Sequence, residues 1–202
     1  MSDLFESGGL AGSPSDSVAN APRPLADRLR PQSLSDVVGQ DHLLGPEGPL
    51  GRMVANGRPT SVILWGPPGT GKTTIARLLS TAFNLHFEQL SAVFSGVADL
   101  KKTFEAARLR RVAYAGARQR DQGTLLFIDE IHRFNRSQQD SFLPVVEDGT
   151  VVLVGATTEN PSFELNGALL SRAQVLVLRR LDDAALEMLL QRAEAQIGRA
   201  HV

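Results

Sequence analysis

Residues 66–74 read GPPGTGKTT and fit the pattern G-x-x-x-x-G-K-T, whose residue types suit phosphate binding. The glycines let the backbone wrap closely enough for its N–H groups to face phosphate oxygens. Lys72 would reach the outer phosphates, and the Thr73 hydroxyl would ligate Mg²⁺. An accidental match in a Gly/Pro-rich turn is disfavoured by the strand and helix expected on either side. The predicted nucleotide-binding residues of this loop are Gly66, Pro67, Pro68, Gly69, Thr70, Gly71, Lys72, Thr73 and Thr74.

An acidic pair, Asp129 and Glu130, follows the apolar run TLLFI at 124–128. Ligands of open α/β sheets sit at the carboxyl ends of strands, so Asp129 is predicted to hold Mg²⁺, directly or through water. Glu130 is predicted to orient and polarise the attacking water, because phosphoryl transfer needs mainly positioning and charge stabilisation. The alternative is an exposed Asp-Glu turn. DEIH also resembles the DExH box of helicases. That motor needs a second motor domain, for which this chain has no room, so His132 is expected to be a packed or surface residue.

Two further positions lie at predicted strand boundaries. Thr157 and Thr158 come at the carboxyl end of a strand, where a hydroxyl could contact the attacking water or the γ-phosphate. Ordinary β-propensity with a strand-end hydrogen bond explains them equally well. Arg172, in ALLSRAQ at 168–174, separates an apolar helical turn from the run VLVL. It could cap a helix, pair with a carboxylate or reach a phosphate, and its neighbours do not decide between these roles.

Short apolar runs that alternate with helical patterns would position these residues. Strands buried on both faces are predicted for SVILW at 61–65, TLLFI at 124–128, VVLVGAT at 151–157 and VLVL at 175–178. Helices are predicted at 72–83, through Ile75, Leu78, Leu79 and Ala82, and at 97–118, through Leu100, Phe104 and Ala107. Buried strands alternating with helices predict an α/β fold, a parallel sheet with helices on both faces.

The two ends of the chain differ from this central part. Residues 1–24 are rich in Ser, Gly, Ala, Asn and Pro, and we expect a disordered tail there. The α/β domain is expected to cover 25–180. A further helix is predicted at 181–196, as the start of a second, helical piece. Its predicted apolar stripe is Leu186, Leu189, Leu190 and Ala193.

Composition excludes several classes of protein. The net charge of −1 is no global sign of a nucleic-acid binder, so such binding would need a local patch. The chain has no cysteine, and its four histidines lack metal-ligand spacing, which argues against disulfides and zinc sites. Its start does not resemble a signal peptide, and no apolar run approaches the roughly 20 residues that span a membrane. We therefore expect a cytoplasmic protein without membrane contact.

Taken together, these motifs resemble the AAA+ ATPases, and in particular their clamp-loader-type members. LADRLRPQSLSDVVGQDHLLG at 25–45 resembles the segment that precedes the phosphate loop and wraps the adenine. FIDEIHRFNRSQQDSFLPVVEDG at 127–149 and EDGTVVLVGATTENPSFELNGALLSRAQV at 147–175 are similar to the family of replication-associated recombination protein A and Werner-helicase-interacting protein. The resemblance covers about 25–196. GATTENPSFELN and HRFNRSQQD are specific to it, whereas the two phosphate-site motifs indicate only the superfamily.

The resemblance implies a DNA-dependent ATPase that uses ATP and Mg²⁺ in replication fork maintenance, recombination and repair. It implies DNA partners with fork, gap or end structures, single-stranded-DNA-binding protein, and a homo-oligomeric ring, a tetramer in the full-length protein. It places Val38, Gly39 and Gln40 at the adenine, and Thr158 at the position called sensor 1. Arg172 falls on the arginine finger, which faces the γ-phosphate of a neighbouring subunit. The residues to which it gives catalytic roles are Glu130, Thr158 and Arg172, and Ser91 in QLSAV falls where a polar residue restrains the catalytic glutamate.

Residues 101–120 form a basic stretch that offers a candidate DNA surface. They hold seven Lys and Arg against the single acidic residue Glu105. Sequence-independent phosphate contacts and an ordinary solvated face are equally open interpretations. HRFNRSQQD at 132–140 is expected to be a second polar-basic loop beside the ATP site. SDLF at 2–5 resembles the end of sliding-clamp-binding peptides but lacks their leading glutamine, so a sliding clamp is a weak candidate partner.

AAA+ chains of this type continue through a helical lid with a sensor 2 arginine, and this family adds an oligomerisation region. We expect the lid to be cut off after its first helix. IGRAHV at 197–202 equals one reading frame of a common sequencing adapter followed by a stop, and we expect it to be a read-through artefact. A genomic copy that itself ends in IGRAHV would contradict this.

Other functions remain open from the sequence. One is a clamp-loader subunit, and another is a Holliday-junction branch-migration ATPase, which shares the GATT pattern. Stimulation of ATPase activity by DNA ends and gaps, by a sliding clamp or by four-way junctions separates these from the main interpretation. The last alternative is a nucleotide-binding module without turnover, because the rest of the lid is missing.

Overall fold

The computed structural model describes residues 29–114 and 123–198. The chain divides into two units, residues 1–30 and 31–202, and the fold below is that of the second. Several predicted features lie outside the described residues: the tail at 1–24 with its SDLF segment, the basic residues Arg118 and Arg120, and residues 199–202. Residues 197–198 continue the last helix.

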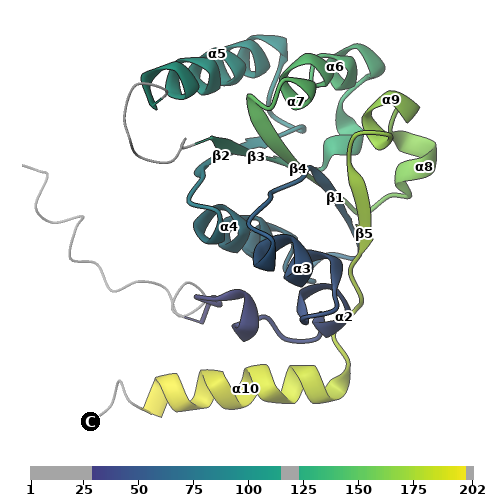
Figure 1. The fold of residues 1–202 in the computed structure, drawn as a ribbon. Helices are drawn as coiled ribbons and strands as arrows, with labels where there is room; N and C mark the ends of the chain where they lie inside the picture. Colours follow the sequence, from purple (N-terminus) through teal and green to yellow (C-terminus); the bar gives the residue numbers. More distant parts are fainter. Residues whose placement is uncertain (1–28, 115–122, 199–202) are drawn as a thin grey trace, which may run out of the picture. The chain divides into compact units, whose positions relative to one another are not determined.

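Five parallel strands form one sheet in the order β2-β3-β4-β1-β5 (Figure 1). They are β1 (Val62–Trp65), β2 (His86–Ser91), β3 (Thr124–Asp129), β4 (Val151–Thr157) and β5 (Gln174–Val177). The strands that end in the phosphate loop, the acidic pair and the two threonines are therefore neighbours at the centre of the sheet. Their carboxyl ends meet at one edge, as the sequence predicts.

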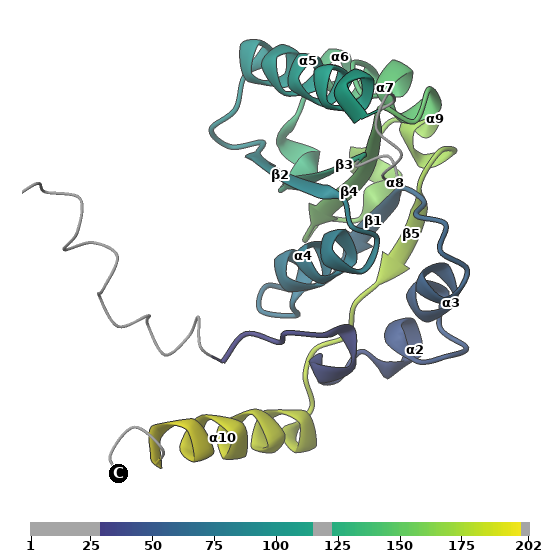
Figure 2. The same cartoon turned by 60° about the vertical axis from the view of Figure 1, so that its left-hand side comes forward.

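Helices cover both faces of this sheet (Figures 1 and 2). On one face lie α5 (Val97–Tyr114), α7 (Leu143–Glu147), α8 (Pro161–Glu164) and α9 (Gly167–Leu170). On the other lie α2 (Asp41–Leu44), α3 (Pro49–Ala55) and α4 (Lys72–Ala82). Short helices η1 (Leu34–Asp36), η2 (Ile131–Arg133) and α6 (Arg136–Asp140), and a final α10 (Asp183–Gly198), complete the described part.

Alternate residues of β1, β3 and β4 pack into the two apolar cores. Ile63 packs into the core under α5 and α7, whereas its neighbours Val62 and Leu64 pack into the core under α3 and α4. Phe127 and Ile128 divide in the same way, and both are fully buried. A strand whose two faces are both apolar must be covered on both sides, since its side chains alternate with a period of two. The predicted α/β fold is confirmed.

The two edge strands differ from the prediction. β5 was expected to be buried on both faces, but Val175 and Val177 are 39% and 49% exposed while Leu176 is 3% exposed. That prediction is wrong because β5 lies at the edge of the sheet and only one of its faces is covered. β2, at the other edge, was not predicted at all. Its sequence HFEQLS carries charged and polar groups among partly exposed positions, so it lacks an apolar run.

The helices also correct the prediction in detail. Leu100, Phe104 and Ala107 of α5 are buried as expected, but in α4 Ala76 is buried and Ala82 is exposed. The predicted stripe of α10 is wrong in part, because Leu186 and Leu190 are 46% and 64% exposed and the helix turns Ala185 inward instead. The loop expected at 132–140 is instead mostly helical, in η2 and α6. Asn135 caps α6 by accepting a hydrogen bond from the Gln138 N–H.

Candidate active site

The phosphate loop owes its shape to its glycines. Gly69 and Gly71 have φ angles of 78° and 90°, in the left-handed region that favours glycine. A Cβ on either would meet no atom within 4 Å, so space lies beside both. Gly66 is required for a different reason, since a Cβ there would lie 2.7 Å from the Leu178 carbonyl oxygen at the end of β5. The loop is a wide turn held closely against the sheet.

Backbone donors at the start of α4 lack acceptors. Gly71 is the N-cap of this 11-residue helix. Within the described part of the chain, the N–H groups of Gly71, Lys72 and Thr73 donate to no protein acceptor. Such N–H groups at a helix N-terminus, with the positive end of the helix dipole, form an anion-binding site. These three N–H groups are therefore available for the phosphates of the predicted nucleotide.

Lys72 lies folded into this loop. Its Nζ donates to the carbonyl oxygens of Gly66, at 2.6 Å, and Pro67, at 2.8 Å, and the residue is 9% exposed. Burial lowers the pKa of the Lys72 ammonium below its usual value, although the Glu130 and Asp129 carboxylates act in the opposite direction. Lys72 therefore has a cationic group beside the unpaired N–H groups and within the field of the predicted Mg²⁺ ligand Asp129 and the predicted catalytic residue Glu130.

The acidic pair ends β3 in a special backbone conformation. Asp129 is the last residue of the strand, and Glu130 has a φ of 53°, a left-handed conformation that is rare for a residue with a side chain. Such strain is often found at functional sites, where it aims a side chain. The Thr73 hydroxyl and Asp129 carboxylate offer oxygen ligands, which suits Mg²⁺ because that ion keeps several water or phosphate ligands. Among the described residues no group of three or more His, Asp or Glu suits another metal.

The segment predicted to contact adenine packs against the link to α10. Gly39 has a φ of 77°, and a Cβ there would lie 2.7 Å from Leu181 Cδ2. Gln40 is fully buried; its amide donates to the Arg179 carbonyl oxygen at 2.8 Å and accepts from the Arg179 N–H at 3.1 Å. An adenine contact by Val38, Gly39 and Gln40 stays a prediction. The Gln40 amide is already used, so its contact would come from the main chain.

The two threonines at the end of β4 have different surroundings. Thr157 is fully buried, and its hydroxyl lies 2.9 Å from His132 Nδ1 and accepts from the Glu159 N–H at 3.0 Å. The strand-end hydrogen bond considered above therefore describes Thr157. Thr158 is partly exposed, and its role as sensor 1 stays a prediction. Ser91 makes no side-chain hydrogen bond to Glu130 in the part of the chain that the structure describes.

Arg172 lies away from the phosphate loop of its own chain. It comes two residues before β5, whereas the loop follows β1, and these strands are parallel with Val62 opposite Gln174 and Trp65 opposite Val177. Arg172 is thus at the amino edge of the sheet and the loop at the carboxyl edge, with about 10 Å of strand between them.

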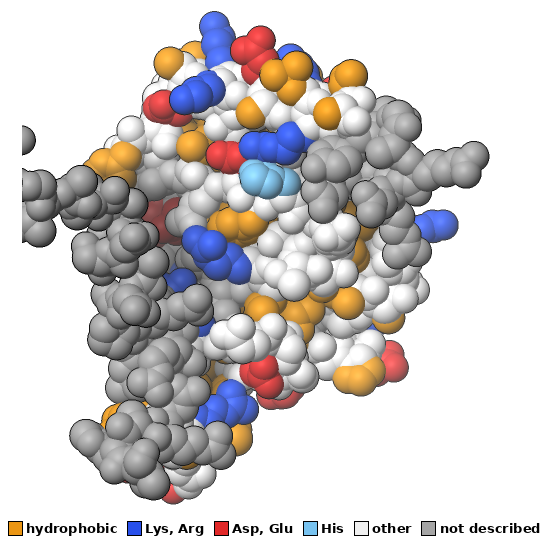
Figure 3. All heavy atoms as spheres, turned by 90° about the vertical axis from the view of Figure 1, so that its left-hand side faces the viewer, with side chains coloured by type: hydrophobic (Ala, Val, Ile, Leu, Met, Phe, Trp, Pro, Cys, Tyr) orange, Lys and Arg blue, Asp and Glu red, His pale blue; other side chains and the backbone are white. Residues whose placement is uncertain are grey.

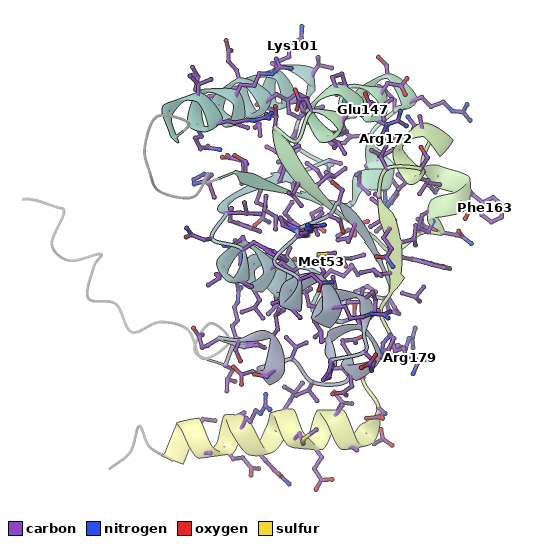
Figure 4. The ribbon with its side chains drawn as sticks, in the orientation of Figure 1. Met53, Lys101, Glu147, Phe163, Arg172 and Arg179 are labelled. Atoms are coloured by element: carbon purple, nitrogen blue, oxygen red, sulfur yellow. The ribbon has the colours of Figure 1, made fainter. Side chains whose placement is uncertain are left out.

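The guanidinium of Arg172 has partners within the chain (Figure 4). It donates to the Ala168 carbonyl oxygen at 2.7 Å and to Ser171 Oγ at 3.0 Å, and it forms an ion pair with Glu147 at the end of α7. Two of the three roles that the sequence left open, the helix cap and the ion pair, therefore occur in the single chain.

The model of the AAA family, the ATPase family associated with various cellular activities, matches residues 62–181. The chain belongs to the AAA ATPase family. The matched range runs from β1, ahead of the phosphate loop, to Leu181 at the Gly39 contact, so it includes the loop, the acidic pair, the threonines and Arg172.

Individual AAA proteins refine the similarity. Replication-associated recombination protein A of Haemophilus influenzae is 51% identical over 170 residues, which cover 84% of this chain but 36% of that protein. ATPase WRNIP1 of Dictyostelium discoideum is 46% identical over 169 residues, 84% of this chain and 18% of that protein. The resemblance stated from the sequence is confirmed. The chain spans little more than a third of the first of these relatives.

A solved structure supports the AAA fold independently. The Thermotoga maritima RuvB Holliday junction branch migration motor aligns with a TM-score of 0.65 and 28% identity, covering 84% of this chain and 55% of that one. None of the described helices is long and apolar enough to cross a membrane.

Two residues of the AAA site were not assigned roles from the sequence. His132 was expected to be a packed or surface residue, and its side chain is indeed 7% exposed, but it lies between Glu130 and Thr157. Glu147 carries no motif, and its pairing with Arg172 depends on the end of α7 lying beside the segment that precedes β5. The only sequence feature that could have indicated a role for His132 is its position two residues after Glu130, and this spacing alone does not show where the ring points.

Proposed function

We propose that this chain binds Mg·ATP at the phosphate loop and hydrolyses it. The unpaired N–H groups of Gly71, Lys72 and Thr73 beside the buried Lys72 ammonium carry this proposal. They form an anion site at the same sheet edge as Asp129 and Glu130. A nucleotide with several phosphates matches both the N–H groups and the cation.

Each residue has a role that its position supports. Lys72 exchanges the carbonyl oxygens of Gly66 and Pro67 for phosphate oxygens when ATP binds. Thr73 and Asp129 would hold Mg²⁺, which neutralises charge on the phosphates. Glu130 orients and polarises the attacking water. Thr158 contacts the γ-phosphate or that water.

We further propose that Arg172 completes the site of a neighbouring subunit. Its position at the amino edge separates it from its own phosphate loop, which supports a role toward a nucleotide bound by another copy. An arginine that approaches a leaving phosphoryl group raises rates about 10³–10⁵-fold where this has been characterised. This role requires a ring of subunits, and a tetramer is the size that the family resemblance implies.

DNA is the proposed partner that ATP hydrolysis serves, at forks, gaps or ends and together with single-stranded-DNA-binding protein. The support is the similarity to proteins named for replication-associated recombination. The basic helix α5 supports it less strongly. Arg110 pairs with Glu88 at 2.7 Å, and the Arg111 guanidinium donates to the Asp148 carbonyl oxygen at 2.7 Å, so both are engaged within the chain.

That leaves Lys101, Lys102 and Arg108 of α5 for phosphate contacts; all three are exposed. Figure 3 shows one face of the molecule, on which Lys and Arg side chains are mixed with acidic and hydrophobic ones over the upper part. A mixed surface of this kind favours weak, salt-dependent contacts with the DNA backbone over sequence-specific binding.

Phosphate release by the purified chain tests the proposal, with gapped duplex, four-way junction or a sliding clamp added in parallel. We expect turnover that Glu130→Gln abolishes while ATP still binds, and the strongest stimulation by DNA with gaps or ends. Stimulation by four-way junctions alone would favour branch migration, the activity named in the RuvB structure. Binding of ATP without turnover under all conditions would favour a nucleotide-binding module.

A further inference from the structure

His132 joins two parts of the site that the sequence left separate. It is the second residue of η2, the short helix that begins directly after Glu130, and its side chain is 7% exposed. Its Nδ1 atom lies 2.9 Å from the Thr157 hydroxyl oxygen and 3.4 Å from Glu130 Oε2. One ring nitrogen thus lies within reach of the carboxylate that ends the β3 motif and of the hydroxyl that ends β4.

The groups around His132 favour a proton on that nitrogen. The Thr157 oxygen accepts from the Glu159 N–H at 3.0 Å, and its own hydrogen can go to the Glu159 carbonyl oxygen at 3.2 Å. An ionised carboxylate can only accept. A bare Nδ1 lone pair would face the Glu130 carboxylate unfavourably, whereas an Nδ1–H would donate to the Thr157 oxygen at 2.9 Å and turn its positive charge toward the Glu130 carboxylate 3.4 Å away.

We propose that His132 is a positioning residue of the hydrolytic site, which orients the Glu130 carboxylate through an Nδ1–H that Thr157 anchors. This rests on the proposed hydrolysis of ATP. The short contact to Thr157 holds the ring, and the longer contact to Glu130 steers the carboxylate toward the attacking water. Glu130 is the N-cap of η2 and has a left-handed backbone with φ 53°, a conformation that sets the direction in which its side chain leaves the strand.

The network also connects the catalytic carboxylate to the strand that carries the predicted γ-phosphate sensor. Thr157 is followed directly by Thr158, so a movement of β4 on nucleotide binding reaches Glu130 through one side chain. Within the described residues no side chain forms a close hydrogen bond to the Glu130 carboxylate, and His132 Nδ1 faces it at 3.4 Å. The polar residue expected from the sequence to restrain it, Ser91, makes no such contact. His132 supplies that restraint from η2 instead.

The position of the ring proton gives a direct test on the whole chain. Nitrogen NMR of ¹⁵N-histidine-labelled protein distinguishes the two neutral imidazole tautomers. We expect His132 to carry its proton on Nδ1, and its resonances to move in Glu130→Gln, whereas those of His42 and His86 do not. A His132 ring protonated on Nε2 alone would overturn the proposal, because such a ring cannot donate to the carboxylate.

Kinetics then separate positioning from packing. His132→Ala removes the donor, whereas His132→Asn keeps an amide N–H near the Nδ1 position. We expect His132→Ala to lower kcat about tenfold with an unchanged ATP Kd, and His132→Asn to recover much of the loss. His86→Ala, at an exposed histidine of β2, should leave kcat unchanged. Equal kcat in wild type and His132→Ala would overturn the proposal, as would equal loss in both His132 variants.

These outcomes are distinguishable from failure of the proposed function. A wild-type chain that binds ATP without turnover would contradict hydrolysis. The tautomer of His132 and the response of its resonances to Glu130→Gln do not depend on turnover, so they still decide whether the contact exists.

Discussion

Arg172 and Glu147 form an ion pair that joins the segment before β5 to the end of α7. Both belong to the amino edge of the sheet, and their side chains are 35% and 49% exposed. An ion pair so exposed contributes under about 1 kcal/mol to stability. The ion pair instead fixes the direction of the Arg172 guanidinium, which also donates a hydrogen bond to the Ala168 carbonyl oxygen.

Glu147→Gln should therefore affect hydrolysis more than folding. Without the carboxylate, the Arg172 guanidinium samples more directions and reaches a neighbour's nucleotide less often. We expect phosphate release to fall by about three- to tenfold with unchanged ATP affinity and a melting temperature within about 2 °C of wild type. Glu105→Gln, at an exposed position of α5, is the matched control. An equal effect of both variants would show that Glu147 does not orient Arg172.

Lys72 should determine nucleotide affinity. Its ammonium is the cation beside the unpaired N–H groups of the loop, and a hydrogen bond to a charged group contributes about 1.5–3 kcal/mol. We expect Lys72→Ala to weaken Mg·ATP binding by roughly ten- to a hundredfold, measured by calorimetry. Lys101→Ala on α5 controls for loss of a positive charge. Wild-type affinity in Lys72→Ala would place the nucleotide elsewhere.

Gly39 should couple the predicted adenine segment to the chain near α10. Alanine there meets a left-handed φ of 77° and a contact of 2.7 Å with Leu181. The backbone alone costs about 1–2 kcal/mol, or roughly 2–8 °C in melting temperature for a domain of this size. Gly57→Ala has a similar φ of 63° but no atom within 4 Å, so it isolates the backbone effect. We expect Gly39→Ala to melt lower than Gly57→Ala and to bind ATP more weakly, and equal behaviour would contradict this.

The lysines of α5 should account for part of any DNA binding. Each phosphate contact that is lost makes the log–log salt dependence of binding shallower by about 0.9. We expect the double variant Lys101→Ala/Lys102→Ala to bind gapped DNA more weakly, with a slope shallower by up to about 1.8. Arg52→Ala/Arg58→Ala, near α3, removes the same charge as a control. Equal losses in the two double variants would mean that only net charge matters.

The sequence predicted the centre of the fold better than its edges. β1, β3 and β4 are apolar on both faces because helices cover both, and their sequences show it as unbroken runs. β2 and β5 are edge strands; polar groups enter β2, and Val175 and Val177 stay exposed on β5. An apolar run does not show whether its strand lies at the edge of the sheet, since strand order depends on pairing between segments far apart in the sequence.

The same limit applies to the site. Lys72, Thr73, Asp129 and Glu130 stand in short local motifs that can be read directly from the sequence. In the structure the Lys72 ammonium lies within the field of the Asp129 and Glu130 carboxylates. His132–Thr157 and Glu147–Arg172 are pairs 25 residues apart, brought together only by the register of the strands and the packing of short helices. Neither pair has a spacing that could have indicated it.

Mixing two inactive variants tests most directly the claim that one chain's Arg172 completes another's site. Glu130→Gln keeps the arginine but lacks the water-orienting carboxylate, whereas Arg172→Ala keeps its own nucleotide site but lacks the arginine. We predict that each alone binds ATP and releases almost no phosphate, and that their mixture regains phosphate release, highest near equal amounts. A mixture no more active than its components, or wild-type turnover by Arg172→Ala alone, would contradict the account.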